Sequence, residues 1–248
     1  MSPFPPLAFI VLMAFVALAV VMARISTCLR PAPKAELHGL GDTQLGIAVE
    51  LARDQPDFDQ MVGLPAAGPG STSISTRSWL RRQQFLDFLF IALYVALFWL
   101  LGGVEKSAGF PVAWLLGTAA QAAIVCAGLC DVLEDVAILR ALAGSPKTLP
   151  IRTFGLPKWG LFFLAALLLS AWFFRFSFHP LAAGAAGAAG APSLDRALAG
   201  LIGLLLAAGG LLGLAGVLRG RGAPIHQAMS YGMVPAIGVL LILMVRLQ

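Results

Sequence analysis

Charged side chains are scarce in this chain. Only 12% of its 248 residues are Asp, Glu, Lys or Arg, whereas 59% are hydrophobic, and the mean hydropathy is +0.87. Soluble domains carry about 25% charged residues, so this composition excludes that class and indicates a membrane protein. The net charge of +5 does not predict a nucleic-acid partner, because the Lys and Arg residues are dispersed between apolar runs.

Cysteine and histidine are equally rare, with three of each. Cys126 and Cys130 are one helical turn apart in an apolar run, where disulfide geometry is poor, so we expect both to be small buried apolar side chains. The histidines are His38, His179 and His226. They lie in separate segments without metal-ligand spacing. We therefore expect no disulfide, no metal site and no cofactor.

Long apolar runs are abundant, in contrast. A bilayer core of about 30 Å needs roughly 20 apolar residues of helix. Six runs approach that length: Pro5 to Ala23, Phe85 to Leu101, Val112 to Leu129, Trp159 to Phe176, Ala197 to Leu218, and a weaker run from Ile225 to Val245 that Pro235 interrupts. The sequence therefore predicts an all-α integral membrane bundle of about six transmembrane helices, in direct contact with the lipid bilayer.

The runs divide the chain into three parts. Residues 1–23 form an N-terminal transmembrane anchor, since no charged side chain precedes Arg24 and a secretory signal would begin with positive charge. Residues 24–82 form a cytoplasmic segment, and residues 83–248 form a five-helix bundle. Within the cytoplasmic segment, the alternation from Leu45 to Leu51 predicts a short strand, and Asp54 predicts a helix start. The Ala, Gly, Pro, Ser and Thr content of Ala66 to Thr76 predicts a flexible linker.

The distribution of positive charge predicts the orientation. Thirteen of the 17 Lys and Arg residues fall in the segments that share one side of the membrane if the N-terminus is outside the cytoplasm. Positive charge favours the cytoplasmic side, so we expect both termini outside. The Ala-, Gly-, Leu- and Arg-rich composition favours a bacterial source, and so we expect the cytoplasmic membrane of a bacterium.

Acidic residues at the edges of two apolar runs are the candidate functional residues, because charge is expensive within a membrane helix. They form a candidate polar cluster of Gln84, Asp87, Asp131, Glu134 and Asp135, to which Gln121 could be added. Helical periodicity places Asp87 on a stripe with Tyr94, and Asp131 on a face of small residues, so both should point into the bundle. The candidate charge partners are Arg81, Arg82 and Arg140.

The same two runs carry a resemblance. The segment from Ser78 reads SWLRRQQFLDFLFIALYVALF, and the next run reads AGLCDVLED from Ala127. They resemble a group of uncharacterised bacterial membrane proteins that share LDFLFI followed by Tyr, then DxxEN, and that carry a short segment similar to Val49–Ala52. Asp135 stands where that group has Asn. The resemblance implies a four- or five-helix bundle with two acidic helices and no particular reaction.

The fifth run is rich in small residues at helical spacing: Gly203, Ala207, Gly209, Gly210 and Gly213. Small residues let another backbone approach closely in a membrane. The pattern predicts either close packing within the chain or an interface with a second copy or another membrane protein.

Three functions remain open at this stage. The first is a non-enzymatic membrane component in which arginines pair with the acids and hold the bundle together. The second is a transporter or proton-coupled protein that uses Asp87 and Asp131. The third is a carboxylate-dependent membrane enzyme, although no HExxH, Asp-rich or Ser/His motif is present. An aqueous cavity that reaches the acids would favour the second function, and a closed cluster paired with arginine would favour the first.

Overall fold

The chain folds into helices throughout its described part. The computed structural model describes residues 6–29, 31, 37, 40, 44–63, 72–106, 111–144, 151–178 and 193–247. These contain α1 (Pro6–Ser26), α2 (Leu45–Glu50), α3 (Gln55–Val62), α4 (Thr72–Lys106), α5 (Pro111–Leu142), α6 (Arg152–Phe178), α7 (Ser193–Arg219), α8 (Gly222–Ala228), the π-helical segment η2 (Met229–Met233) and α9 (Val234–Leu247). The prediction of an all-α membrane bundle is confirmed.

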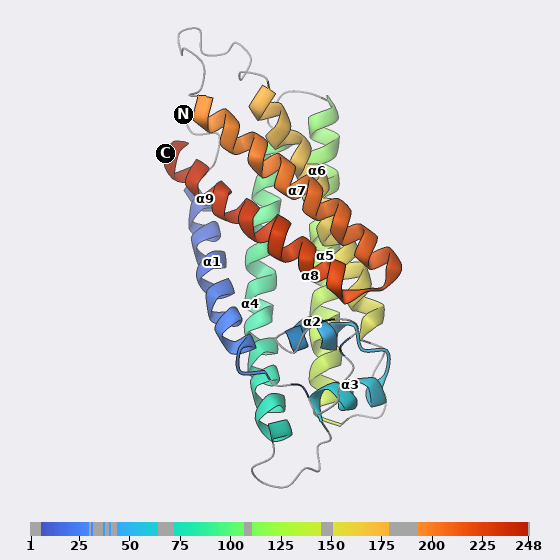
Figure 1. The fold of residues 1–248 in the computed structure, drawn as a ribbon. Helices are drawn as coiled ribbons and strands as arrows, with labels where there is room; N and C mark the ends of the chain where they lie inside the picture. The colour runs from blue at the N-terminus through green and yellow to red at the C-terminus, as the bar shows by residue number, and fades with distance from the viewer. Residues whose placement is uncertain are drawn as a thin grey trace.

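Five described helical segments are long and apolar enough to cross a membrane. They are α1, α4, α6, α7 and the continuous run Gly222–Leu247, which joins α8, η2 and α9. The predicted third span lies within α5, which is not one of these five. At a rise of about 1.5 Å per residue, its 32 residues extend roughly 48 Å, and α5 packs against both α4 and α6 (Figure 1). Large apolar side chains such as Leu7 and Trp114 are exposed on the outside of the bundle, as lipid contact requires.

The helices run up and down, and α2 and α3 sit at one end. Figure 1 shows α1 beside α4, with α7 and α9 crossing the bundle obliquely. The first turn of α1 and the last turn of α9 lie at the same end, opposite to α2 and α3. This arrangement places the start of α4, the end of α5 and the start of α6 next to the two short helices.

The predicted strand from Leu45 to Leu51 is wrong, because this segment forms α2. Its Leu45, Ala48 and Val49 share one helical face and are buried, a spacing that a short alternating run does not distinguish from a strand. The predicted helix start is confirmed. The Asp54 side chain accepts a hydrogen bond of 2.9 Å from the backbone N–H of Asp57 at the start of α3.

The predicted linker is shorter than expected. Residues 66–71 of it lie outside the described residues, but Thr72–Thr76 already belong to α4. The helix therefore begins before residue 83, where the bundle was expected to start. His38 and His179 also lie outside the described residues.

The last predicted span is a helix with a π-helical interruption. Met229–Met233 form η2, immediately before Pro235 in α9. A proline inside a helix lacks an N–H donor and its ring collides with the carbonyl four residues earlier. A widened π turn just upstream relieves that conflict, which explains why the helix continues through Pro235.

The small residues of α7 pack against helices of the same chain. A Cβ atom added at Gly213 would lie 2.3 Å from the Phe163 ring, and one at Gly209 would lie 2.6 Å from the Met233 side chain. Gly203 faces Phe174 and Gly210 faces the Phe163 backbone in the same way, whereas Ala207 is only half-buried. This face is therefore occupied by α6 and η2. An interface with another copy stays a prediction.

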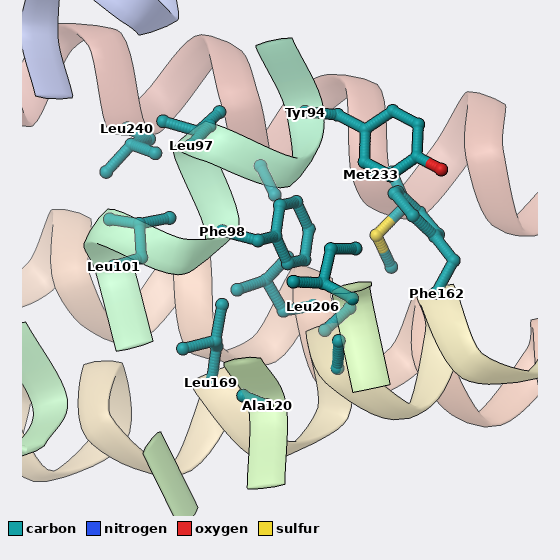
Figure 2. Close-up of a cluster of buried hydrophobic side chains, with 14 of the residues drawn as sticks. Tyr94, Leu97, Phe98, Leu101, Ala120, Phe162, Leu169, Leu206, Met233 and Leu240 are labelled. Carbon is teal, nitrogen blue, oxygen red and sulfur yellow. The ribbon is translucent and has the colours of Figure 1, made fainter. Parts of the chain in front are cut away.

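An apolar layer fills the middle of the bundle. Figure 2 shows Leu97, Phe98 and Leu101 of α4 meeting Phe162 and Leu169 of α6, Leu206 of α7 and Leu240 of α9, with Tyr94 at the edge of the layer. A gap among these side chains measures about 20 Å³, and its lining is apolar. Since this is little more than one water molecule needs, the layer is effectively dry.

Candidate functional site

The two faces predicted to point into the bundle are both buried. The α4 face comprises Gln84, Asp87, Ile91, Tyr94 and Phe98. The α5 face comprises Ala113, Gly117, Ala120, Ile124, Ala127, Asp131 and Asp135. Asp87 and Asp131 consequently meet between the helices. One oxygen of each, together with one of Asp135, lies within 4.8 Å of the others.

A buried lysine that the sequence did not single out completes the site. The Lys158 Nζ atom, near the start of α6, lies 3.0 Å from Glu50 Oε2, 3.0 Å from Asp131 Oδ1 and 2.5 Å from Glu134 Oε2. These are charge contacts rather than aligned hydrogen bonds, because Asp131 Oδ1 and both Glu134 oxygens have no hydrogen-bond partner of good geometry. Lys158 thus joins α2, α5 and α6 through one ammonium group.

The predicted arginine partners do not reach the acids. Arg81, Arg82 and Arg140 are all exposed, and Arg82 lies over the ring of Trp79. Arg140 follows Asp131 by nine residues, which at 100° per residue puts it on the opposite side of α5. The prediction of arginine pairing is therefore wrong, and Lys158 takes that role.

The fourth acid, Glu50, comes from α2. The Trp159 Nε1–H donates a hydrogen bond of 2.8 Å to Glu50 Oε2. Gly155 allows this approach, because a Cβ atom there would lie 2.4 Å from the Glu50 carbonyl oxygen and 2.7 Å from Glu134 Oε1. Burial raises the pKa of the Glu50 carboxyl above its ordinary value, while the nearby Lys158 charge acts in the opposite direction.

Negative groups outnumber positive ones in this cluster. Among the described residues, five carboxyl groups gather around the one ammonium group of Lys158: Glu50, Asp87, Asp131, Glu134 and Asp135. The Tyr94 hydroxyl donates a hydrogen bond of 2.9 Å to Asp131 Oδ2, but Asp135 Oδ2 has no partner. An uncompensated buried charge costs several kcal/mol. The excess must therefore be neutralised by protons or by a bound cation.

A cavity of about 140 Å³ reaches this cluster. Its polar wall contains Glu50, Gln83, Asp87, Asp131 and Lys158, and its apolar wall contains Phe15, Met22, Ile47, Phe90, Tyr94, Trp159, Phe162, Met229 and Ile237. Seven helical elements contribute, so only the folded bundle assembles it. Met22, Ile47 and Gln83 at its rim are half-buried rather than fully enclosed.

The remaining candidate residues lie elsewhere or lack a partner. Gln84 is buried, but its Oε1 makes no hydrogen bond. Gln121 lies near the other end of the bundle, where it accepts a hydrogen bond from Lys106 and donates one to the Trp99 carbonyl. Glu105, which the sequence did not single out, is also buried there without a partner for its Oε2.

The prediction of buried cysteines on α5 is wrong. Cys126 is exposed and Cys130 is half-buried, and both are free thiols. Residue 126 precedes the buried Ala127 by one position, so it faces the outside of the bundle. Lipid contact suits a small apolar side chain as well as burial does.

Comparison with protein-family models, with curated proteins and with solved structures finds no match for this chain.

Proposed function

We propose that this protein is a membrane transport protein that binds a cation at the carboxylate wall of the central cavity. The observation that carries the proposal is the excess of buried carboxyl groups beside a cavity, with Asp87 and Asp131 both on its wall. Intramembrane carboxyl groups that line a cavity commonly mark ion pathways or proton relays. A bound proton or cation would supply the positive charge that the cluster lacks.

A purely structural cluster is the second candidate. The contacts of Lys158 with Glu50, Asp131 and Glu134 favour it, since they connect three helices. This candidate does not account for Asp87, which makes no ion pair or hydrogen bond with any described residue. It also leaves the cavity without a role. We propose no reaction, because the described site contains no activated nucleophile.

Asp87→Asn and Asp131→Asn separate the two candidates. If the protein binds a cation at this site, Asp131→Asn should lower the melting temperature, because the substitution removes a partner of Lys158 at a cost of about 3 to 5 kcal/mol. Asp87→Asn should leave the melting temperature equal or higher in cation-poor buffer, because it removes a charge that makes no ion pair and lies beside Asp131 and Asp135. The measurement is a thermal melt of the detergent-solubilised full chain and of both variants, with the double variant for coupling.

The melts also report ligand binding. A cation that binds only the folded protein at 100 times its Kd should stabilise the wild type by about 2.7 kcal/mol, and this gain should vanish in Asp87→Asn. If Asp87→Asn is destabilised as much as Asp131→Asn and no cation or proton raises the wild-type melting temperature, the cluster is structural.

We further propose that the protein resides in a bacterial cytoplasmic membrane with both termini outside the cytoplasm. The shared end of α1 and α9 and the positive charges near α2, α3 and the α5–α6 connection support this orientation. Reporters fused after Arg221 or within residues 144–158 should show the cytoplasm, and one fused at Lys106 should show the outside. A reversed pattern would invert the proposed orientation.

A further inference from the structure

Five aromatic residues line the same cavity as the acids. Successive ring contacts connect Phe15 to Phe90 at 4.8 Å between centroids, Phe90 to Tyr94 at 5.9 Å, Tyr94 to Phe162 at 5.8 Å and Phe162 to Trp159 at 6.1 Å. The rings come from α1, α4 and α6. The wall of the cavity therefore combines electron-rich aromatic rings with carboxyl groups.

The site already holds one ammonium group in this manner. The Lys158 Nζ atom lies 4.9 Å from the centroid of the Trp159 ring while it contacts the carboxylates. An ammonium ion within about 6 Å of a ring centroid is attracted by the ring quadrupole, and more strongly where water is excluded. The walls are therefore suited to a cation that carries apolar groups.

Asp87 is available to bind a second cation, in addition to Lys158. Its exposed fraction is 8%, it lies on the cavity wall, and within the described parts of the chain it has neither an ion-pair nor a hydrogen-bond partner. A carboxyl group so deeply buried is expected to have one. Phe90 and Tyr94 follow Asp87 by about one and two helical turns, so ring and carboxyl group border the same space.

We propose that the cavity binds a small organic ammonium ion, with its positive nitrogen beside Asp87 and its alkyl groups against Phe90 and Tyr94. This inference rests on the proposed cation site and names its ligand class. The volume of about 140 Å³ limits the ligand, since cavities of about 150 Å³ hold a molecule the size of benzene. Alkali ions fit less well, because nine of the fourteen lining residues are apolar or aromatic and cannot replace the water molecules of a hydration shell.

Tetramethylammonium chloride is the probe, and sodium chloride at equal ionic strength is the control. Calorimetric titration of the detergent-solubilised full chain should show saturable binding of tetramethylammonium and none of sodium. Asp87→Asn should weaken binding at least about tenfold, and Phe90→Leu about fivefold to tenfold, since a desolvated cation–π contact is worth roughly 1 to 2 kcal/mol. Glu105→Gln is the matched control, because it removes another buried acid from α4 outside the cavity and should leave the affinity unchanged.

The outcomes separate the ligand class from the function. Sodium or potassium binding that Asp87→Asn abolishes, without tetramethylammonium binding, overturns the organic-cation inference and retains the proposed function. If Phe90→Leu and Phe15→Leu bind tetramethylammonium as tightly as the wild type does, the rings do not contribute to binding. That result also overturns the inference. Failure of every cation to bind a protein that melts cooperatively overturns both.

Discussion

Replacing Lys158 by methionine is expected to destabilise the protein more than any other single charge removal. The change leaves Glu50, Asp131 and Glu134 without the ammonium group that contacts all three. Breaking a buried ion pair by removing one partner costs about 3 to 5 kcal/mol. For a chain of this size we expect the melting temperature to fall by roughly 10 °C, measured by circular dichroism in detergent.

Lys106→Met is the matched control for this substitution. Lys106 lies in the last turn of α4, where it donates a hydrogen bond to Gln121 and lies over the Trp114 ring. Such a partly exposed contact is worth at most about 1 kcal/mol. The combined Lys158→Met and Glu134→Gln variant should regain part of the lost stability, because it removes one of the unpaired acids. Equal melting temperatures for Lys158→Met and Lys106→Met would contradict the central role of Lys158.

Gly117→Ala is also expected to destabilise the protein. A Cβ atom at Gly117 would lie 2.5 Å from the Gly102 carbonyl oxygen and 2.8 Å from the Lys106 side chain. The carbonyl belongs to the α4 backbone and cannot move aside as a flexible side chain would. We expect α4 and α5 to separate locally, at a cost of about 1 to 3 kcal/mol, which a thermal melt would detect.

Gly103→Ala gives the comparison for the same helix pair. The nearest atom to a Cβ there is Gln121 Nε2 at 3.8 Å, an ordinary van der Waals distance. Because alanine also favours a helix over glycine by about 1 kcal/mol, this variant should be as stable as the wild type or more so. If Gly117→Ala and Gly103→Ala have the same melting temperature, the close approach of α4 and α5 does not contribute to stability.

The membrane class and the buried faces could be predicted because they depend on local pattern alone. Hydropathy over about 20 residues identifies a spanning helix, and a period of 3.6 residues identifies which side chains share a face. Asp87 and Asp131 were correctly expected between helices on this basis. The predicted strand from Leu45 to Leu51 was wrong, since a run of seven residues fits either the helical or the strand period.

The role of Lys158 as the positive group of the site could not be predicted from local sequence pattern. Glu50 and Trp159, which are joined by a hydrogen bond, are separated by 109 positions, and no periodicity relates α2 to α6. Lys158 directly precedes an apolar run, where a lysine commonly extends toward the interface and remains solvated. Only the packing of α2 over this helix end, which Gly155 permits, buries Lys158 and turns it toward the acids.

The apolar layer beside Tyr94 opposes the passage of a charge along the bundle. From Tyr94 to Leu101 the α4 helix rises about 10 Å, and the side chains around that stretch leave almost no room for water (Figure 2). An unsolvated charge would face a barrier of several kcal/mol across it. This apolar layer therefore lies between the cavity beside Asp87 and the end of the bundle that contains Glu105. If the protein carries a cation as proposed, passage across this layer requires the helices to rearrange, as in a carrier.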